Sequence, residues 1–176
     1  MPNVTFFQLY HFFIEESIMT WERILKNCRK YDCYPTIETF FSTCPPLIRN
    51  YLTLQTIPAG QLLIQAGAPC GTVYILVSGR LQAIEEKAGE IPYSFFDLSP
   101  FDIVGDYELF SEDAESYVTV RAWEPSACLT IPPGFYLQWL STDSTALFFR
   151  TRLLMKKLSL QLNSSRRYLL MSYGQR

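Results

Sequence analysis

The sequence predicts a mainly β protein with flanking helices, in which an antiparallel β-roll over residues 51–140 leads into one long helix and a hinge over residues 141–176. Short extended segments, separated by turn residues about every ten positions, follow one another between residues 52 and 131. Beyond residue 140, apolar residues recur at three- and four-residue steps. With 176 residues, of which 48% are hydrophobic and 18% charged, the chain suits one globular domain with appendages.

The first 50 residues are predicted to be a helical segment that precedes the roll. Apolar residues from Phe6 to Cys28 recur at helical spacing, which predicts a helix, in one or two pieces, over residues 4–29. Pro35 marks a loop, and short helical stretches are expected at residues 36–41 and 47–51.

The roll is predicted from a series of short strands that are bounded by turn residues. The expected strands are residues 52–57, 61–65, 72–77, 80–86, 91–98, 117–123 and 126–131. Turns are expected at 58–60 and 66–69, and residues 99–113 form a tight connection. Residues 87–90 are expected to be a hairpin loop, with 91–98 as the return strand of 80–86. Short strands at this spacing indicate a closed or sandwich-like all-β unit.

A long helix follows the roll after two prolines, Pro132 and Pro133, that end the sheet. Residues 134–140 predict a short helix, and either Ser141 or Asp143 caps a helix that runs to about Ser172. Thirty helical residues span roughly 45 Å. The apolar stripe of this helix contains Leu147, Leu154, Leu158, Leu162 and Leu169.

This stripe is longer than a small roll can cover. Pairing with the same helix of a second subunit would bury it, so the stripe predicts a homodimer. The alternative is that the stripe packs back on the roll and the N-terminal helices.

Several classes of function are excluded by composition. The net charge is −2, so the chain is not expected to bind nucleic acid by charge. Five irregularly spaced cysteines and a single histidine, His11, fit neither a metal site nor an iron–sulfur cluster, and no cofactor is expected. The absence of a His-rich metal set argues against an enzyme, so no catalytic residues are assigned. No run of 18 apolar residues predicts a membrane span, and reduced thiols suit a cytoplasmic protein.

Four segments together resemble the effector domain of the catabolite-activator and fumarate–nitrate-reductase (Crp/Fnr) family of transcription regulators. They are residues 58–67, 73–81, 101–110 and 117–122, of which Val73 to Leu81 is the most similar. Gly174-Gln175-Arg176 resembles the hinge that precedes the DNA-binding domain of that family. The resemblance covers about residues 50–176.

The resemblance implies a double-stranded β-helix (jelly roll) of the cyclic-nucleotide-binding kind, followed by a dimerisation helix. It also implies a role in effector sensing, with DNA contacted only through a domain beyond Arg176. In nucleotide-binding members, the segment that corresponds to Gly105 presents N–H groups and an acid to the ligand, and an arginine follows it. The ligand-pocket candidates carried over are Val104, Gly105, Asp106, Leu109, Ser116 and Tyr117.

The sequence departs from this pattern where the phosphate would bind. Asp106 holds the acid position with one methylene fewer than glutamate, and Ser116 stands where the arginine would fall. Acidic residues surround the site, and Tyr117 replaces a small residue. An anionic cyclic phosphate would therefore lack its partner, and cyclic AMP is not expected to bind in the usual way. A small-molecule effector of another kind, or none, stays open. The alternative function is a stand-alone module that acts through protein partners.

Overall fold

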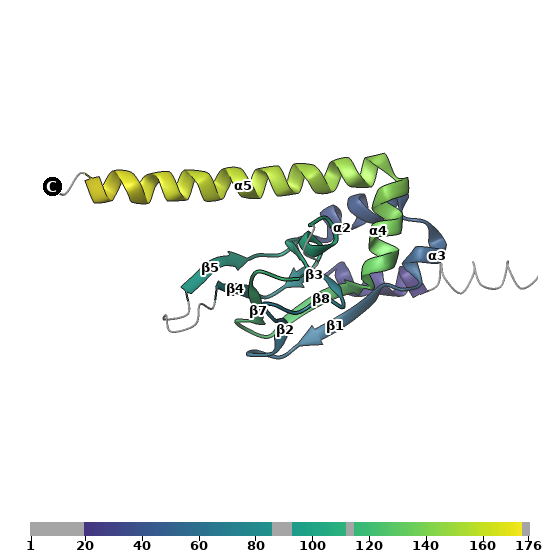
Figure 1. The fold of residues 1–176 in the computed structure, drawn as a ribbon. Helices are drawn as coiled ribbons and strands as arrows, with labels where there is room; N and C mark the ends of the chain where they lie inside the picture. The colour runs from purple at the N-terminus through teal and green to yellow at the C-terminus, as the bar shows by residue number, and fades with distance from the viewer. Residues whose placement is uncertain (1–19, 86–92, 112–114, 174–176) are drawn as a thin grey trace, which may run out of the picture.

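Among the described residues, the roll consists of two four-stranded antiparallel sheets. The computed structural model describes residues 20–85, 93–111 and 115–173 of the chain (Figure 1). Its strands are β1 (Thr53–Ile57), β2 (Leu62–Ile64), β3 (Val73–Ser78), β4 (Leu81–Glu85), β5 (Tyr93–Leu98), β6 (Ile103–Val104), β7 (Thr119–Ala122) and β8 (Ser126–Ile131). The sheet orders are β1-β8-β3-β6 and β2-β7-β4-β5. The predicted jelly roll with flanking helices is confirmed.

Helices gather at one end of the roll and along one side of it (Figure 1). They are residues 20–28, α2 (Tyr34–Phe40), the 3-10 turn η1 (Phe41–Thr43), α3 (Pro46–Arg49), the 3-10 turn η2 (Tyr107–Leu109), α4 (Pro133–Thr142) and α5 (Ser144–Tyr173). The part of the predicted first helix before residue 20 lies outside the described residues. Residues 99–113, predicted only as a tight connection, contain β6 and η2. The division of the chain at residues 50 and 140 stays a prediction.

Two hydrophobic cores share the β1-β8-β3-β6 sheet. One core lies between the sheets and includes Ile57, Leu76, Leu81, Val120 and Cys128. The other lies between this sheet and the helices and includes Ile37, Phe41, Ile75, Leu129 and Trp139. Successive side chains of a strand point to opposite faces, so Cys128 enters one core and Leu129 the other. All six residues of β8 are buried for this reason.

An aromatic cluster fixes the helices to the end of the roll. The ring of Phe40 lies 4.9 Å from that of Trp139 and 5.4 Å from that of Phe149, centroid to centroid. Trp139 lies on α4 and Phe149 on α5, so the cluster joins α2 to both C-terminal helices. Aromatic pairs at such distances contribute about 0.5–1.5 kcal/mol each beyond their buried area.

Asp143 lies immediately before α5 and caps its N-terminus. Its Oδ1 atom accepts hydrogen bonds from the backbone N–H groups of Thr145 (2.9 Å) and Ala146 (3.2 Å). Its Oδ2 atom accepts a hydrogen bond from Trp139 Nε1 (3.1 Å). Of the two predicted caps, the structure therefore uses Asp143. Within the described residues, no helix, α5 included, combines the length and the hydropathy of a membrane-crossing segment.

Buried thiols predict a loss of stability at alkaline pH. Burial raises the pKa of Cys44 and Cys128 to about 12 and that of Cys28 to about 11. The pKa of a thiol in the unfolded chain is about 8.5, well below these values. Between about pH 8.5 and the folded pKa, the thiol ionises in the unfolded chain but stays protonated in the fold. The free energy of unfolding therefore falls as the pH rises through this range. From pH 8 to pH 10, the free energy of unfolding should fall by about 2 kcal/mol per thiol in denaturant titrations under reducing conditions. In Cys128→Ala the fall should be smaller; an identical fall would contradict this assignment.

Candidate ligand-binding site

The candidate site begins at a tight turn after β6. Val104 pairs with Tyr74 of β3, and Gly105 then turns the chain with a φ of +82° into η2. A Cβ atom on Gly105 would lie 2.5 Å from the carbonyl oxygen of Thr72 and 2.6 Å from Cys70 Sγ. The turn therefore needs glycine both for its left-handed conformation and for its close approach to the segment before β3.

Asp106, which follows this turn, lies in a buried hydrogen-bonded group. Its Oδ2 atom accepts hydrogen bonds from Arg150 Nε (2.6 Å) and from the Tyr136 hydroxyl (3.0 Å). Its Oδ1 atom accepts one from an Arg150 terminal amine (2.8 Å). We call these three residues the Arg150 clamp. It joins the β6–η2 turn to α5 through a bidentate ion pair. The hydrogen bond from Tyr136 joins the same turn to α4.

The electrostatics of the clamp keep Arg150 charged and Tyr136 neutral. Burial lowers the pKa of the Arg150 guanidinium, but the hydrogen bonds and the charge of Asp106 outweigh it, and the net direction is upwards. Burial, together with the negative charge of Asp106, raises the pKa of the Tyr136 phenol well above its usual value. Tyr136 is therefore a hydrogen-bond donor to Asp106 throughout the ordinary pH range.

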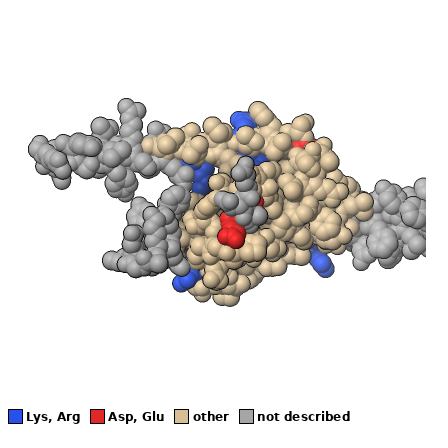
Figure 2. All heavy atoms as spheres, in the orientation of Figure 1, with Lys and Arg blue, Asp and Glu red and all other residues tan. Residues whose placement is uncertain are grey.

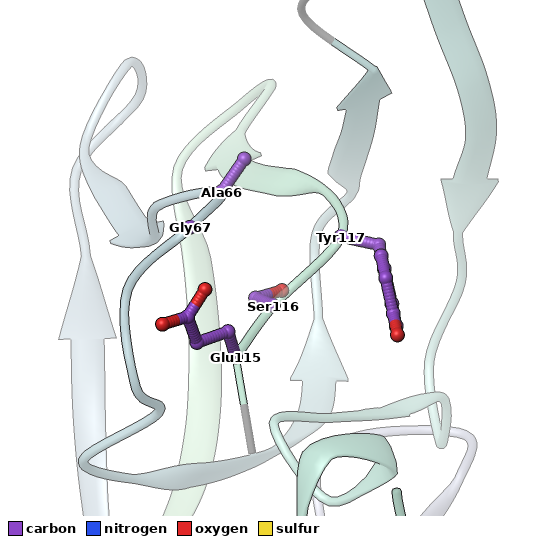
Figure 3. A pocket seen from close by; sticks show the side chains of 5 residues that line it. All are labelled: Ala66, Gly67, Glu115, Ser116 and Tyr117. Atoms are coloured by element: carbon purple, nitrogen blue, oxygen red, sulfur yellow. The ribbon is translucent and has the colours of Figure 1, made fainter. Parts of the chain in front are cut away.

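A pocket of about 440 Å³ lies elsewhere in the roll, and none of the clamp residues lines it. It is lined by Ala66 and Gly67 after β2 and by Glu115, Ser116 and Tyr117 before β7 (Figure 3). The two lining segments are joined by hydrogen bonds from the Gly67 N–H to the Ser116 carbonyl (2.8 Å) and from the Ser116 N–H to the Ala68 carbonyl (3.2 Å). The Ser116 hydroxyl donates to the carbonyl of Val118 (3.0 Å). These donors are therefore already used by protein acceptors.

The charge at this pocket is negative. Glu115 is the one charged residue of the five that line it, and in Figure 3 its carboxylate lies on the side of Gly67 while Tyr117 points the other way. On the described part of the face in Figure 2, basic side chains are few and scattered, and acidic side chains lie near the middle. The Tyr117 ring packs edge-on against Tyr107 at 5.9 Å, and both side chains are more than half exposed.

The structure distributes the six predicted pocket residues over three places. Ser116 and Tyr117 line the pocket. Asp106 faces α5 in the clamp, and Gly105 lies buried in the turn. Half-buried Val104 and Leu109 pack against the two hydrophobic cores.

Sequence reasoning missed Arg150 and Tyr136 as the partners of Asp106. A signal for Arg150 was present, because Ala146, Phe149 and Leu153 form a second apolar face of the long helix. Arg150 is on that face, at positions four after Ala146 and three before Leu153. A charged residue on an apolar helix face indicates a buried partner.

α5 has one face on the roll and a second, exposed apolar face. Its packed face carries Ala146, Arg150 and Lys157, whose Nζ lies 2.9 Å from Asp102 Oδ1 and 4.8 Å from the Phe96 ring centre. Of the predicted dimer residues, Leu147, Leu154, Leu158 and Leu162 are 40%, 44%, 48% and 62% exposed. The side chain of Leu169 lies outside the described residues. Figure 1 shows α5 lying along the roll and continuing past it.

Comparison with known proteins gives a family match for half of the chain. Residues 54–143 match the cyclic nucleotide-binding domain. The described residues after this match form α5, so no DNA-binding domain is found among them. None of the curated proteins compared with the chain matches it.

Solved structures of Crp/Fnr-type regulators share the fold. The catabolite activator protein of Thermus thermophilus is 19% identical with a TM-score of 0.56, over 72% of this chain and 62% of that one. The c-di-GMP-responsive global regulator CLP of Xanthomonas campestris is 21% identical with a TM-score of 0.58, over 74% of this chain and 61% of that one.

A cAMP-binding acyltransferase of Mycobacterium smegmatis is 28% identical with a TM-score of 0.49, over 57% of this chain and 32% of that one. The chain thus spans about a third of the acyltransferase and less than two thirds of either regulator.

Proposed function

The chain belongs to the cyclic nucleotide-binding domain family, and from this premise we propose that it is the effector-sensing and dimerisation part of a Crp/Fnr-type regulator that does not bind cyclic AMP in the usual way. The observation that carries the proposal is the buried Arg150 clamp, because it occupies the acid of the site from within the chain. The absence of enzymatic activity and a cytoplasmic location stay predictions.

The clamp closes Asp106 off from a ligand. Its carboxylate accepts three hydrogen bonds out of about four that it could accept, but the residue is only 2% exposed. A ribose hydroxyl therefore cannot reach the carboxylate unless Arg150 or Tyr136 moves away. The displaced guanidinium would then be a buried charge without its partner, which costs about 3–5 kcal/mol.

The pocket also disfavours a phosphate. A cyclic phosphate there would face the Glu115 carboxylate, and none of the five lining residues is basic. Two like charges 4 Å apart repel by about 1 kcal/mol in bulk water and by about 4 kcal/mol near a protein surface. An uncharged or cationic effector meets no such repulsion.

The dimer proposal rests on the exposed face of α5. Leu154, Leu158 and Leu162 follow one another at four-residue steps and stay exposed, while a different face packs on the roll. Apolar side chains that gather on one stripe of a long helix are typical of helix pairing. A second copy of α5 presents the same stripe and can bury it by two-fold symmetry.

Thermal unfolding with added nucleotide tests the sensing proposal. We expect 1 mM cyclic AMP, and 1 mM cyclic di-GMP in a parallel arm, to leave the melting temperature unchanged. A ligand bound with a dissociation constant of 10 μM would stabilise the fold by about 2.7 kcal/mol and raise the melting temperature by roughly 5–10 °C.

Glu115→Gln is the matched control for this experiment. It removes the repelling charge but supplies no cation, so it should stay as unresponsive as the wild type. A rise of several degrees with cyclic AMP in the wild type would contradict the proposal.

The alternative function is a stand-alone module that acts through protein partners. It is favoured by three aromatic side chains around the candidate site, Tyr107, Phe110 and Tyr117, which are 60%, 55% and 58% exposed. Exposed aromatic residues are enriched at protein–protein interfaces. The reading frame beyond Arg176 distinguishes the two functions, because a regulator requires a DNA-binding domain there.

A further inference from the structure

We propose that the Arg150 clamp is a built-in lock that holds the first half of α5 on the roll without an effector, so that docking of α5 and ligand access to Asp106 exclude each other. The inference rests on the proposed function, because it requires that no nucleotide binds to Asp106. Arg150 then acts as a positioning residue for the long helix.

The clamp connects the three elements whose relative placement determines where α5 lies. Asp106 belongs to the turn after β6, Tyr136 to α4, and Arg150 to the second turn of α5. Both oxygens of Asp106 accept from Arg150, and Tyr136 adds a third hydrogen bond. Because a bidentate guanidinium–carboxylate pair fixes direction as well as distance, it also fixes the rotation of α5 about its own axis.

A second contact holds α5 further along but is much weaker. Lys157 lies two turns after Arg150, roughly 10 Å along the helix, and pairs with Asp102, with both side chains 27% exposed. Asp102 and Asp106 belong to the same connection between β5 and η2. Ion pairs that reach solvent contribute little, because water screens them. The buried inner pair is therefore the stronger of these two ion pairs, and it acts beside the packing of Phe149 in the aromatic cluster.

The lock implies a coupling between the site and the helix. A ligand that needs the Asp106 carboxylate must displace Arg150, and with it the hydrogen bonds that orient the first turns of α5. Such a ligand binds only the state in which α5 is undocked, and it shifts the population towards that state by its own differential affinity. The docked helix is thus the state of the unliganded chain.

Hydrogen–deuterium exchange of the full chain tests the lock without any nucleotide. In Arg150→Met we expect the backbone amides of residues 147–158 to exchange at least tenfold faster than in wild type, while the amides of β3 and β8 keep their rates. Local opening accelerates only the amides of the element that opens. The control is Arg152→Met, the same substitution at an exposed position two residues along α5, which should change neither set.

Two outcomes would overturn the proposal. Equal acceleration in α5, β3 and β8 would show that the pair stabilises the whole domain and positions nothing. Unchanged rates in α5 would show that other contacts hold the helix. If Arg150→Met does not fold because Asp106 is left buried and unpaired, the double variant Asp106→Asn/Arg150→Met removes that charge. The double variant should still show selective acceleration of α5, and equal or unchanged rates in it overturn the lock in the same way.

Discussion

A Leu158→Glu variant is expected to sediment as a monomer at protein concentrations at which the wild-type chain is a dimer. Leu158 lies in the middle of the exposed stripe, one helical turn from both Leu154 and Leu162. In a two-fold pair of α5 helices, the two introduced carboxylates would face an apolar surface and lie near each other. Burying such a charge costs several kcal/mol, and each 1.4 kcal/mol weakens association about tenfold, so the dissociation constant should rise by at least about 100-fold.

Sedimentation velocity over a range of concentrations measures this effect, and Ser159→Glu is its control. Ser159 is also exposed on α5 but is rotated by about 100° from Leu158, so it adds the same charge outside the stripe. The control should remain a dimer. A Leu158→Glu variant that stays dimeric would refute this stripe as the seam, and a monomeric wild type would refute the dimer itself.

Replacing Gly105 by alanine is expected to destabilise the domain by about 3 kcal/mol or more, since it adds both backbone strain and a steric clash. The residue has a φ of +82°, and its new Cβ would lie 2.5 Å from a backbone oxygen that belongs to the segment before β3. For a chain of this size, the melting temperature should fall by roughly 6–12 °C. The turn that positions Asp106 would move as well.

Gly60→Ala separates the two causes. Gly60 has nearly the same φ, +80°, but no atom lies within 4 Å of the position of its Cβ. Only the strain remains there, so the loss should be about 1–2 kcal/mol. Denaturant titrations of both variants measure the difference directly. Equal losses would mean that the Gly105 turn relaxes at no cost, and that the close approach to Thr72 constrains nothing.

The local elements of the fold could be predicted because each has a local cause. Alternating and apolar segments between turn residues predicted seven of the eight strands in the described part of the chain, and Asp143 was one of two expected caps for α5. β6 was missed because two residues, Ile103 and Val104, are too short for a period-2 pattern to appear. The hairpin of residues 80–86 with 91–98 was predicted and is confirmed by the pairing of β4 with β5. The pairing of distant strands was not predicted, since no local pattern records which of them meet.

The candidate site was predictable only in part, for the same reason. Resemblance to a family located the turn at Gly105 and the substitution at Ser116. The partner of Asp106 could not be located that way, because Arg150 lies 44 residues further along on an element that was read for its apolar stripe. An arginine on a helix is usually a surface residue. Only packing decides that this one is 7% exposed and paired.

The pairing of the late strand β8 with the early strands β1 and β3 has a consequence for folding during synthesis. The hydroxyls of Thr53 and Thr130 meet at 2.6 Å across 77 residues of sequence. On the ribosome, the apolar strand β3 must wait for roughly 50 further residues before its neighbour β8 exists, which takes roughly 3–10 s at ordinary rates of synthesis. During that time β3 can pair only with the two-residue strand β6, and its edge towards β8 stays open. The yield of the chain in cells should therefore depend on chaperones that bind such segments until β8 emerges.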